Sequence, residues 1–219
     1  MTALLPEDLL VTRALVALDG RLPAGFPHMR LLVVGGYALQ VQGIRTDPGE
    51  ATDVDYIGRP LPGDVREMVN EIGLQYGLGP GWLNNDVLLS GATDIDGIEL
   101  ATGPLRFHAL DAPRLKHFLI EVADPQSLLR MKLVAVDTQL ASFLDSGNTA
   151  DFTRGKDFAD LRRICEHEGL PAASLVRLVD EMSADGYLLE PAATLSAALQ
   201  ALAGRSDLDI LANLKKSSM

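Results

Sequence analysis

The chain has 219 residues, of which 47% are hydrophobic and 22% charged, and this composition excludes a fibrous or intrinsically disordered protein. Its formal net charge of −11 at pH 7 argues against a broad nucleic-acid-binding face, although a local basic patch or a nucleotide bound through metal ions is compatible with it. The single cysteine, Cys165, excludes an intramolecular disulfide and is expected to be a buried structural thiol. Because we find no signal peptide and no apolar stretch long enough to span a bilayer, we expect a cytoplasmic location.

Predicted helices and strands alternate in the first part of the chain. Residues 6–19 have the apolar spacing of an amphipathic helix, and the apolar run 30–34 predicts a buried strand that Gly35 and Gly36 end. The further elements predicted in this part are a short helix over 37–43, a strand over 52–58, a helix over 62–77 and strands over 97–101, 105–110 and 116–123.

After Pro125 the pattern is helical throughout. Residues 126–144 carry an apolar stripe at helical spacing, and further helices are predicted over 154–170, 171–182 and 191–204, with a marginal one over 206–216. This order predicts an α/β or α+β domain over 1–124, followed by a helical domain over 125–219.

Two short stretches carry the candidate chemistry. In the predicted strand 52–58, Asp53 and Asp55 are two residues apart and so project from the same face, where their charges repel unless a cation lies between them. Such oxygen ligands suit Mg²⁺ or Mn²⁺ with substrate phosphates completing the coordination. Gly35 and Gly36, at a strand-to-helix turn, would let a phosphate approach the backbone. Together these features predict phosphoryl or nucleotidyl transfer.

The stretch "VVGGYALQVQGIR…ATDVDYI" resembles the opening motif of the nucleotidyltransferase superfamily, which has the polymerase-β-like fold. More narrowly, the chain is similar to bacterial nucleotidyltransferase-like proteins related to abortive-infection toxins. Those proteins have a G-x-x-R-x-T-x-D-[IV]-D pattern. They also have a helix lysine, which corresponds here to the lysine of "ADPQSLLRMK", and a late K/R-D-x-x-D-L motif, which corresponds to "GKDFADL". The resemblance covers residues 30–165 and implies an α+β fold with a mixed sheet, flanking helices and a C-terminal helical bundle.

The resemblance also implies roles for individual residues. Asp53 and Asp55 would bind the metal, Gly35 and Gly36 would form the phosphate loop, Arg45 and Thr52 would bind the nucleotide, Lys132 would meet the triphosphate, and Asp157 would be the late acid. The implied reaction moves a nucleoside monophosphate from a nucleoside triphosphate to a hydroxyl of RNA, protein or a small molecule, with Mg²⁺ or Mn²⁺. The implied partners are a tRNA or protein acceptor and an antitoxin protein.

The sequence departs from the family pattern at two points. Sixteen residues separate Gly36 from Asp53, and "TDPGE" reads as an insertion that lengthens this loop. The third carboxylate, which many members place on a neighbouring strand, has no clear match. Glu99 is the best candidate, and Asp94 and Asp96 are alternatives within a predicted turn. Glu99 or Asp157 would assist the acceptor hydroxyl.

Several of these residues also have structural interpretations. Lys132 lies at the edge of an apolar helix stripe, where it would either face a cleft or cover apolar surface with its stem. Asp157 and Asp160 would stabilise a helix N-terminus, with Asp160 turned towards solvent. Trp82 is expected to be a core or lid anchor rather than a base-stacking residue, and residues 84–86 are compatible with a plain turn.

Two questions about binding also stay open. The basic cluster of Arg154, Lys156, Arg162 and Arg163 would be either a solvated helix face or a tRNA contact. The alternative to an enzyme is a catalytically degenerate nucleotide- or partner-binding module of the same fold. A weaker alternative is a structural domain with an accidental D-x-D.

Overall fold

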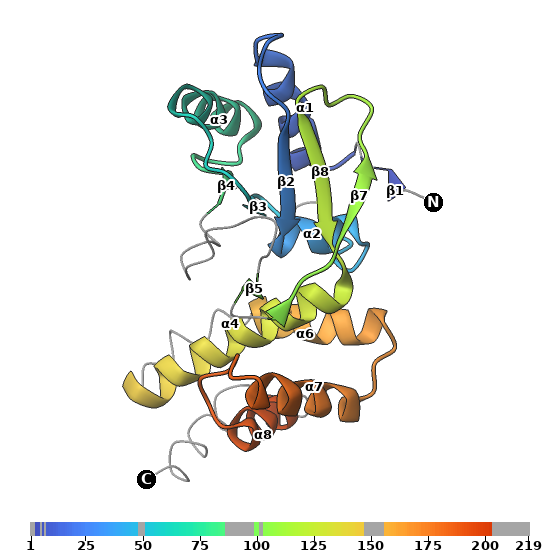
Figure 1. Cartoon of the computed structure of the whole chain (residues 1–219), viewed down its shortest axis with the longest axis vertical. Helices are drawn as coiled ribbons and strands as arrows, with labels where there is room; N and C mark the ends of the chain where they lie inside the picture. Colours follow the sequence, from blue (N-terminus) through green and yellow to red (C-terminus); the bar gives the residue numbers. More distant parts are fainter. Residues whose placement is uncertain are drawn as a thin grey trace. The chain divides into compact units, whose positions relative to one another are not determined.

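The computed structural model describes residues 3–4, 6, 8–47, 51–85, 99–100, 103–146 and 156–202. They divide into two compact units, one drawn from residues 1–100 and 104–128 and the other from 101–103 and 129–219. The sequence places the boundary between 124 and 125, and the division follows at Leu128–Leu129, inside the first helix after Pro125. The chain is α+β with a mixed sheet, as predicted, and Figure 1 shows its elements in sequence colours.

The first unit is built on a sheet with the strand order β1-β7-β8-β2-β3-β4. The bounds of these strands are β1 Ala3–Leu4, β2 Met29–Val34, β3 Val54–Ile57, β4 Leu83–Asn84, β7 Phe107–Asp111 and β8 Phe118–Ala123. Strand β2 pairs parallel with β8 and antiparallel with β3, and β3 pairs parallel with β4. A separate two-stranded ribbon consists of β5, Glu99–Leu100, and β6, Gly103–Pro104.

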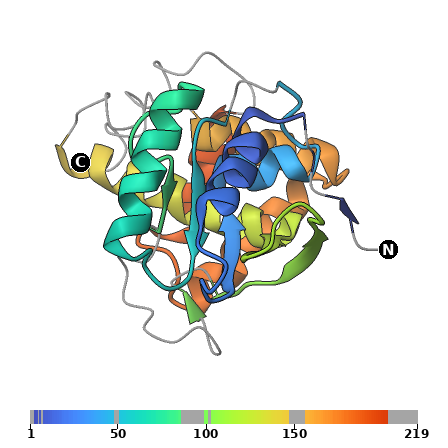
Figure 2. The same cartoon turned by 90° about the horizontal axis from the view of Figure 1, so that it is seen from above.

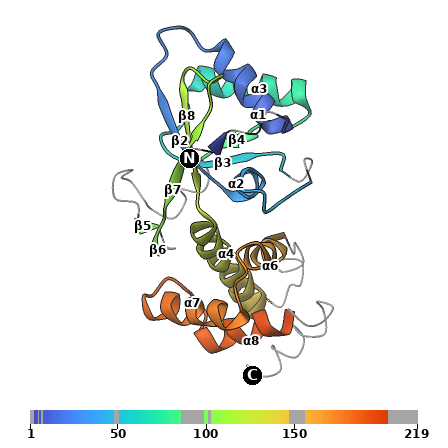
Figure 3. The same cartoon turned by 90° about the vertical axis from the view of Figure 1, so that its right-hand side faces the viewer.

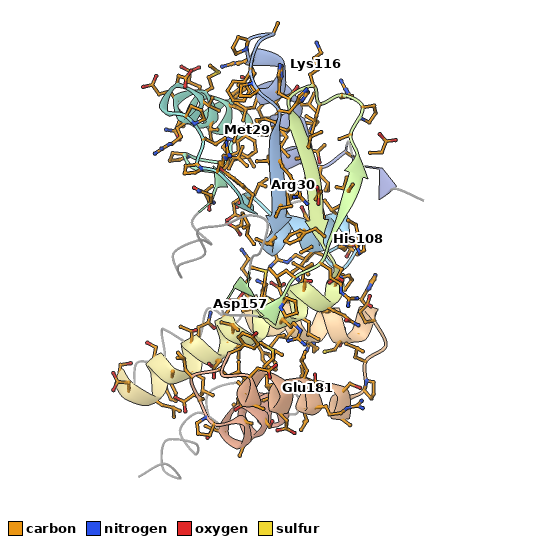
Figure 4. The ribbon with its side chains drawn as sticks, in the orientation of Figure 1. Met29, Arg30, His108, Lys116, Asp157 and Glu181 are labelled. Carbon is orange, nitrogen blue, oxygen red and sulfur yellow. The ribbon has the colours of Figure 1, made fainter. Side chains whose placement is uncertain are left out.

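Three helices cover one face of this sheet: α1, Leu10–Arg21; α2, Gly35–Val41; and α3, Gly63–Tyr76 (Figure 3). Helices α1 and α3 lie side by side (Figure 2). Strand β8 alternates accordingly, because Phe118, Ile120 and Val122 are buried while Leu119 is 55% exposed. On the more open face, Arg30 Nε lies 2.6 Å from Glu121 Oε1 (Figure 4).

The glycine pair after β2 lies inside the following helix, whereas the sequence predicted it before that helix. Gly35 and Gly36 do not separate the strand from a later helix: they are the first two residues of α2. Gly35 has φ 68°, a left-handed conformation that a residue with a Cβ adopts only with strain. The chain therefore turns directly from strand into helix at this glycine, which brings the helix start against the neighbouring strand.

The second unit is mostly helical. Its helices are α4, Pro125–Ser146, whose first turn belongs to the first unit, α6, Lys156–His167, α7, Ala172–Ala184, and α8, Ala192–Leu202. Its core is formed by apolar side chains that are at most 5% exposed, among them Leu133, Val136, Leu140, Phe143, Leu161, Ile164, Val179, Met182, Leu195 and Leu199. No helix in the described ranges is both long and apolar enough to cross a membrane. The predicted helix over 206–216 lies outside the described residues.

Candidate functional site

The candidate site lies at one row of residues across three strands of the sheet. The strand register places Val34 of β2 opposite Asp55 of β3, and Asp55 opposite Asn84 of β4. Gly35 follows Val34 directly, and a Cβ added at Gly35 would overlap Asp55 Oδ2. The absence of a side chain at Gly35 thus allows its backbone to lie against the carboxylate of Asp55, one of the two acids expected to bind metal.

A buried guanidinium lies against the second glycine. A Cβ added at Gly36 would be 2.7 Å from Nη1 of Arg45, and Arg45 is only 4% exposed. The loop that carries Arg45 is held to α2 by backbone hydrogen bonds, because the N–H groups of Ile44 and Arg45 donate to the carbonyl oxygen of Leu39. A positive charge is therefore built in beside the two glycines, within the same unit as Asp55.

On its other side, Asp55 contacts an amide that the sequence did not single out. Asn84 Nδ2 donates to Asp55 Oδ1 at 3.2 Å. The interpretation of residues 84–86 as a plain turn does not hold at Asn84, because this residue belongs to strand β4 and pairs in register with Asp55; Asp86 lies outside the described residues. No local pattern identifies Asn84, since only the pairing of β3 with β4 brings it to the site.

Asp53 and Thr52, which the sequence also predicts at this site, come just before β3. Asp53 is half-buried, one residue before β3 begins, and Thr52 is exposed. If the strand alternation of β3 is continued back by one residue, Asp53 falls on the same face as Asp55. Two carboxylates with one-residue spacing fit Mg²⁺ or Mn²⁺, which take one or two protein carboxylates and complete their coordination with water and phosphate oxygens. In the described ranges, no group of three or more His, Cys, Asp or Glu side chains gathers as a metal site.

The third carboxylate was expected on a strand next to the one that carries Asp55. The described neighbours of β3 are β2 and β4, and β4 presents Asn84 there. Glu99 lies in β5, which pairs with β6 in the separate ribbon, so Glu99 is not on a strand next to β3. The alternatives, Asp94 and Asp96, lie outside the described residues.

In the helical unit, Lys132 and the late motif form an ionic cluster. Lys132 Nζ lies 2.5 Å from Asp157 Oδ1 and 2.9 Å from Asp160 Oδ2. Gln139 Nε2 donates to Asp157 Oδ2 at 2.8 Å, and Asp157 is marked in Figure 4. The prediction that Asp160 faces solvent is wrong: its side chain is 0% exposed. The buried residues of α6 are Asp160, Leu161 and Ile164, so Asp160 belongs to the inward side of this helix.

The opposite charges in this cluster stabilise each other's ionised forms. Burial opposes the charged form of Lys132, but the carboxylates of Asp157 and Asp160 outweigh it and raise the pKa of Lys132. Burial likewise opposes ionisation of Asp157, but the ammonium of Lys132 and the hydrogen bonds from Lys132 and Gln139 outweigh it and lower the pKa of Asp157. The cluster therefore holds α4 and α6 together as a charged unit. The role of Lys132 as a ligand of the triphosphate stays a prediction.

Trp82 and Cys165 were both expected to have structural roles. Trp82 is a core residue, as expected, because it is 1% exposed and its Nε1 donates to the carbonyl oxygen of Val69 at 2.7 Å. Cys165 is half-buried rather than buried; burial and then the charge of Glu166 raise its pKa, which disfavours a thiolate nucleophile.

The basic cluster on the late motif is mostly solvated where it is described. The side chains of Arg162 and Arg163 are 67% and 37% exposed, and Arg162 Nε lies 3.5 Å from Glu166 Oε1. Arg154 lies outside the described residues. Whether this cluster contacts a tRNA backbone stays a prediction.

Comparisons of the chain with protein-family models, curated proteins and solved structures gave no significant match.

Proposed function

We propose that the chain is a metal-dependent nucleotidyltransferase that moves a nucleoside monophosphate from a nucleoside triphosphate to an acceptor hydroxyl. The observation that supports this most directly is the position of the Asp55 carboxylate, which lies between the backbone of Gly35 and the amide of Asn84. The buried guanidinium of Arg45 beside Gly36 adds a positive charge that suits phosphate oxygens.

In this proposal, each residue has a limited task. Asp53 and Asp55 hold Mg²⁺ or Mn²⁺, which supplies charge neutralisation for the phosphates when bound. Gly35 and Gly36 let the Asp55 carboxylate and the Arg45 guanidinium lie against the start of α2, and Arg45 offsets the negative charge of a phosphate bound there. The acceptor oxygen forms a bond to the α-phosphorus, the bond from that phosphorus to the bridging oxygen breaks, pyrophosphate leaves, and the hydroxyl proton passes to water.

A binding module of the same fold is the second candidate, and one observation favours it. Among the described residues, the strand next to β3 presents an amide, Asn84, rather than a carboxylate. Such a site would bind a nucleotide with its metal and transfer nothing. A toxin-like role, with an antitoxin partner and a tRNA or protein acceptor, rests on the resemblance in the two motifs alone.

The test uses α-labelled nucleoside triphosphates with Mg²⁺ or Mn²⁺ and with total cellular RNA and protein as acceptors. We compare the parent chain with Asp55→Asn and with Asp64→Asn, which removes an exposed acid from the first turn of α3. Transfer by the parent and by Asp64→Asn, lost in Asp55→Asn, supports the enzyme, and the labelled species identifies the acceptor class. Binding of the metal–nucleotide complex without transfer supports the binding module. Absence of both in the folded parent contradicts both proposals.

A further inference from the structure

A cavity of about 330 Å³ lies in the first unit, and Asp19 and His117 are part of its lining. It adjoins the start of β2, because the N–H of Met29, labelled in Figure 4, donates to the carbonyl oxygen of His117 at 2.8 Å. Val34, which lies opposite Asp55, is five positions further along β2. Strands rise about 3.3 Å per residue, so the cavity is roughly 17 Å along the strand from the candidate site, and the proposed function gives it no task.

The carboxylate of Asp19, in the last turn of α1, is buried and anchors the start of β8. Its Oδ2 accepts the backbone N–H of Lys116 at 2.7 Å, and its Oδ1 accepts those of His117 and Phe118 at 2.8 and 3.0 Å. A carboxylate offers about four positions for hydrogen bonds. These three bonds therefore leave about one acceptor position, which belongs to Oδ2.

That oxygen faces a ring nitrogen of a buried histidine. His117 Nδ1 lies 3.6 Å from Asp19 Oδ2, and the two side chains are 9% and 1% exposed. Nδ1 is buried and has no hydrogen-bond partner among the residues that the structure describes. Phe26 meets the His117 ring edge-on, with ring centroids 6.0 Å apart and an interplanar angle of 84°, which supports the orientation of the ring. A buried polar atom without a partner costs free energy, so Nδ1 is a candidate for ligand binding.

The gap of 3.6 Å discriminates between the groups that could join these two atoms. A direct hydrogen bond from Nδ1 to Oδ2 would need about 3.2 Å or less. A water molecule that donates to both atoms would hold them about 4.5 Å apart, because each hydrogen bond is about 2.8 Å long. A Zn²⁺ ion about 2.1 Å from each atom, with a tetrahedral angle between the bonds, would hold them about 3.4 Å apart. The gap is therefore closest to the spacing around a metal ion.

The two donor atoms suit a transition-metal ion better than Mg²⁺. Imidazole nitrogen is a common ligand of Zn²⁺, whereas Mg²⁺ prefers oxygen ligands throughout. The three backbone N–H groups on Asp19 provide the outer hydrogen bonds that hold a metal-binding carboxylate in place. No third His, Cys, Asp or Glu side chain of the described ranges gathers with these two, so water in the cavity would complete the coordination. Lys116 and His28 also line the cavity, and both are exposed, so water screens the charge of Lys116.

We propose that Asp19 Oδ2 and His117 Nδ1 bind a divalent transition-metal ion, with Zn²⁺ as the metal whose bond lengths match the gap. The ion joins the last turn of α1 to the start of β8 and so stabilises the first unit. This site is separate from Asp53 and Asp55, and it does not depend on the proposed function.

The test uses the full chain, freed of metal with a chelator, with Asp55→Asn present throughout so that the other proposed metal site is impaired. Zn²⁺ alone is titrated by calorimetry, and NMR of ¹⁵N-labelled histidine follows the rings of the chain's four histidines. His117→Phe removes Nδ1 but keeps a ring beside Phe26, and His108→Phe makes the same change at an exposed position of β7 outside the lining. Fluorescence of Trp82, the single tryptophan, reports whether each variant is folded.

We expect Zn²⁺ to shift the Nδ1 resonance of His117 and to raise the temperature of unfolding. The affinity for Zn²⁺ should be unchanged in His108→Phe and should fall about tenfold or more in His117→Phe, which corresponds to about 1.4 kcal/mol. Excess Mg²⁺ should not displace Zn²⁺.

Three results would overturn the proposal. The first is a His117 ring whose resonances do not respond to Zn²⁺ in the folded protein, as expected if Nδ1 carries a proton and pairs directly with Asp19. The second is equal affinity for Zn²⁺ in His117→Phe and His108→Phe, and the third is displacement of Zn²⁺ by Mg²⁺. The NMR measurement keeps His117 in place and assigns its resonances by substituting the other histidines, so it decides the question even if His117→Phe does not fold.

Discussion

Asp55 and Asn84 face each other across β3 and β4, with Asn84 Nδ2 3.2 Å from Asp55 Oδ1. The amide hydrogen bond fixes the orientation of a carboxylate whose other oxygen lies against Gly35. Residues 29 positions apart in the chain thus define the candidate site together.

Replacing this amide by a carboxylate is expected to strengthen metal binding. In Asn84→Asp, a second carboxylate would face Asp55, and the two charges repel unless a cation lies between them. We expect the affinity for Mn²⁺, measured by calorimetry, to rise about tenfold, equivalent to about 1.4 kcal/mol. Asn70→Asp adds the same charge on α3 and should leave Mn²⁺ affinity unchanged. Equal affinities in Asn84→Asp and the parent would show that Asp55 holds no metal.

Gly35→Ala is expected to damage both the fold and the site. The left-handed φ of 68° costs about 1–2 kcal/mol in a residue with a Cβ, and the added methyl would also displace Asp55 Oδ2. Gly43→Ala is the matched control, because Gly43 has φ 72° but open space around its Cα. Urea unfolding should show a loss in both variants that is larger at Gly35, and Mn²⁺–nucleotide binding should disappear only in Gly35→Ala. Normal binding by Gly35→Ala would contradict the site geometry.

Lys132→Met is expected to destabilise the helical unit strongly. It leaves the carboxylates of Asp157 and Asp160 without their ammonium partner, and the Asp160 side chain is 0% exposed. Removing one partner of such a buried pair costs about 3 kcal/mol or more in the free energy of unfolding. Arg162→Met breaks the exposed pair with Glu166 and should cost less than about 0.5 kcal/mol. Adding Asp160→Asn to Lys132→Met should recover part of the loss; no recovery would show that charge is not the cause.

The same cluster predicts how stability depends on pH. The pKa of Asp157 is lowered in the folded chain, so its contribution is present above the unfolded pKa of about 3.9 and is lost as the pH falls through the folded value. The pKa of Lys132 is raised, so its contribution is present below about 10.4 and is lost as the pH rises through the folded value. Urea unfolding at a series of pH values should show both losses. Asp157→Asn should flatten the acid loss in the parent but leave it unchanged in Lys132→Met.

Two glycines of α3 are expected to respond oppositely to alanine. A Cβ at Gly73 would overlap the carbonyl oxygen of Gly79 and lie 2.6 Å from Cδ1 of Trp82, so Gly73→Ala should lose about 1–3 kcal/mol through overpacking. A Cβ at Gly63 meets nothing within 4 Å, so Gly63→Ala should gain about 0.4–1 kcal/mol because the unfolded chain loses freedom. Thermal unfolding followed by circular dichroism measures both. Stabilisation by Gly73→Ala would contradict the packing of Trp82 against this helix.

Local patterns predicted most of the fold because their causes are local. The apolar spacing of residues 62–77 and 126–144 reflects the helical repeat, and α3 and α4 form over nearly the same ranges. The burial of Trp82 was also predictable, since a single large apolar side chain after a helix usually joins the core. The ends of elements were predicted less well: α1 begins at Leu10, whereas the pattern predicts a helix from residue 6.

The sequence by itself determined that a glycine pair follows an apolar strand, and it predicted Asp53 and Asp55 on one strand face, because side-chain alternation and the freedom of glycine act over a few residues. Only the tertiary structure decided that Gly35 lies against Asp55, that Asn84 completes the row, and that Asp160 is buried beside Lys132. These relations depend on which strands pair and on which side of a helix packs inward. Sheet pairing and helix packing join residues far apart in the chain, so no local pattern encodes them.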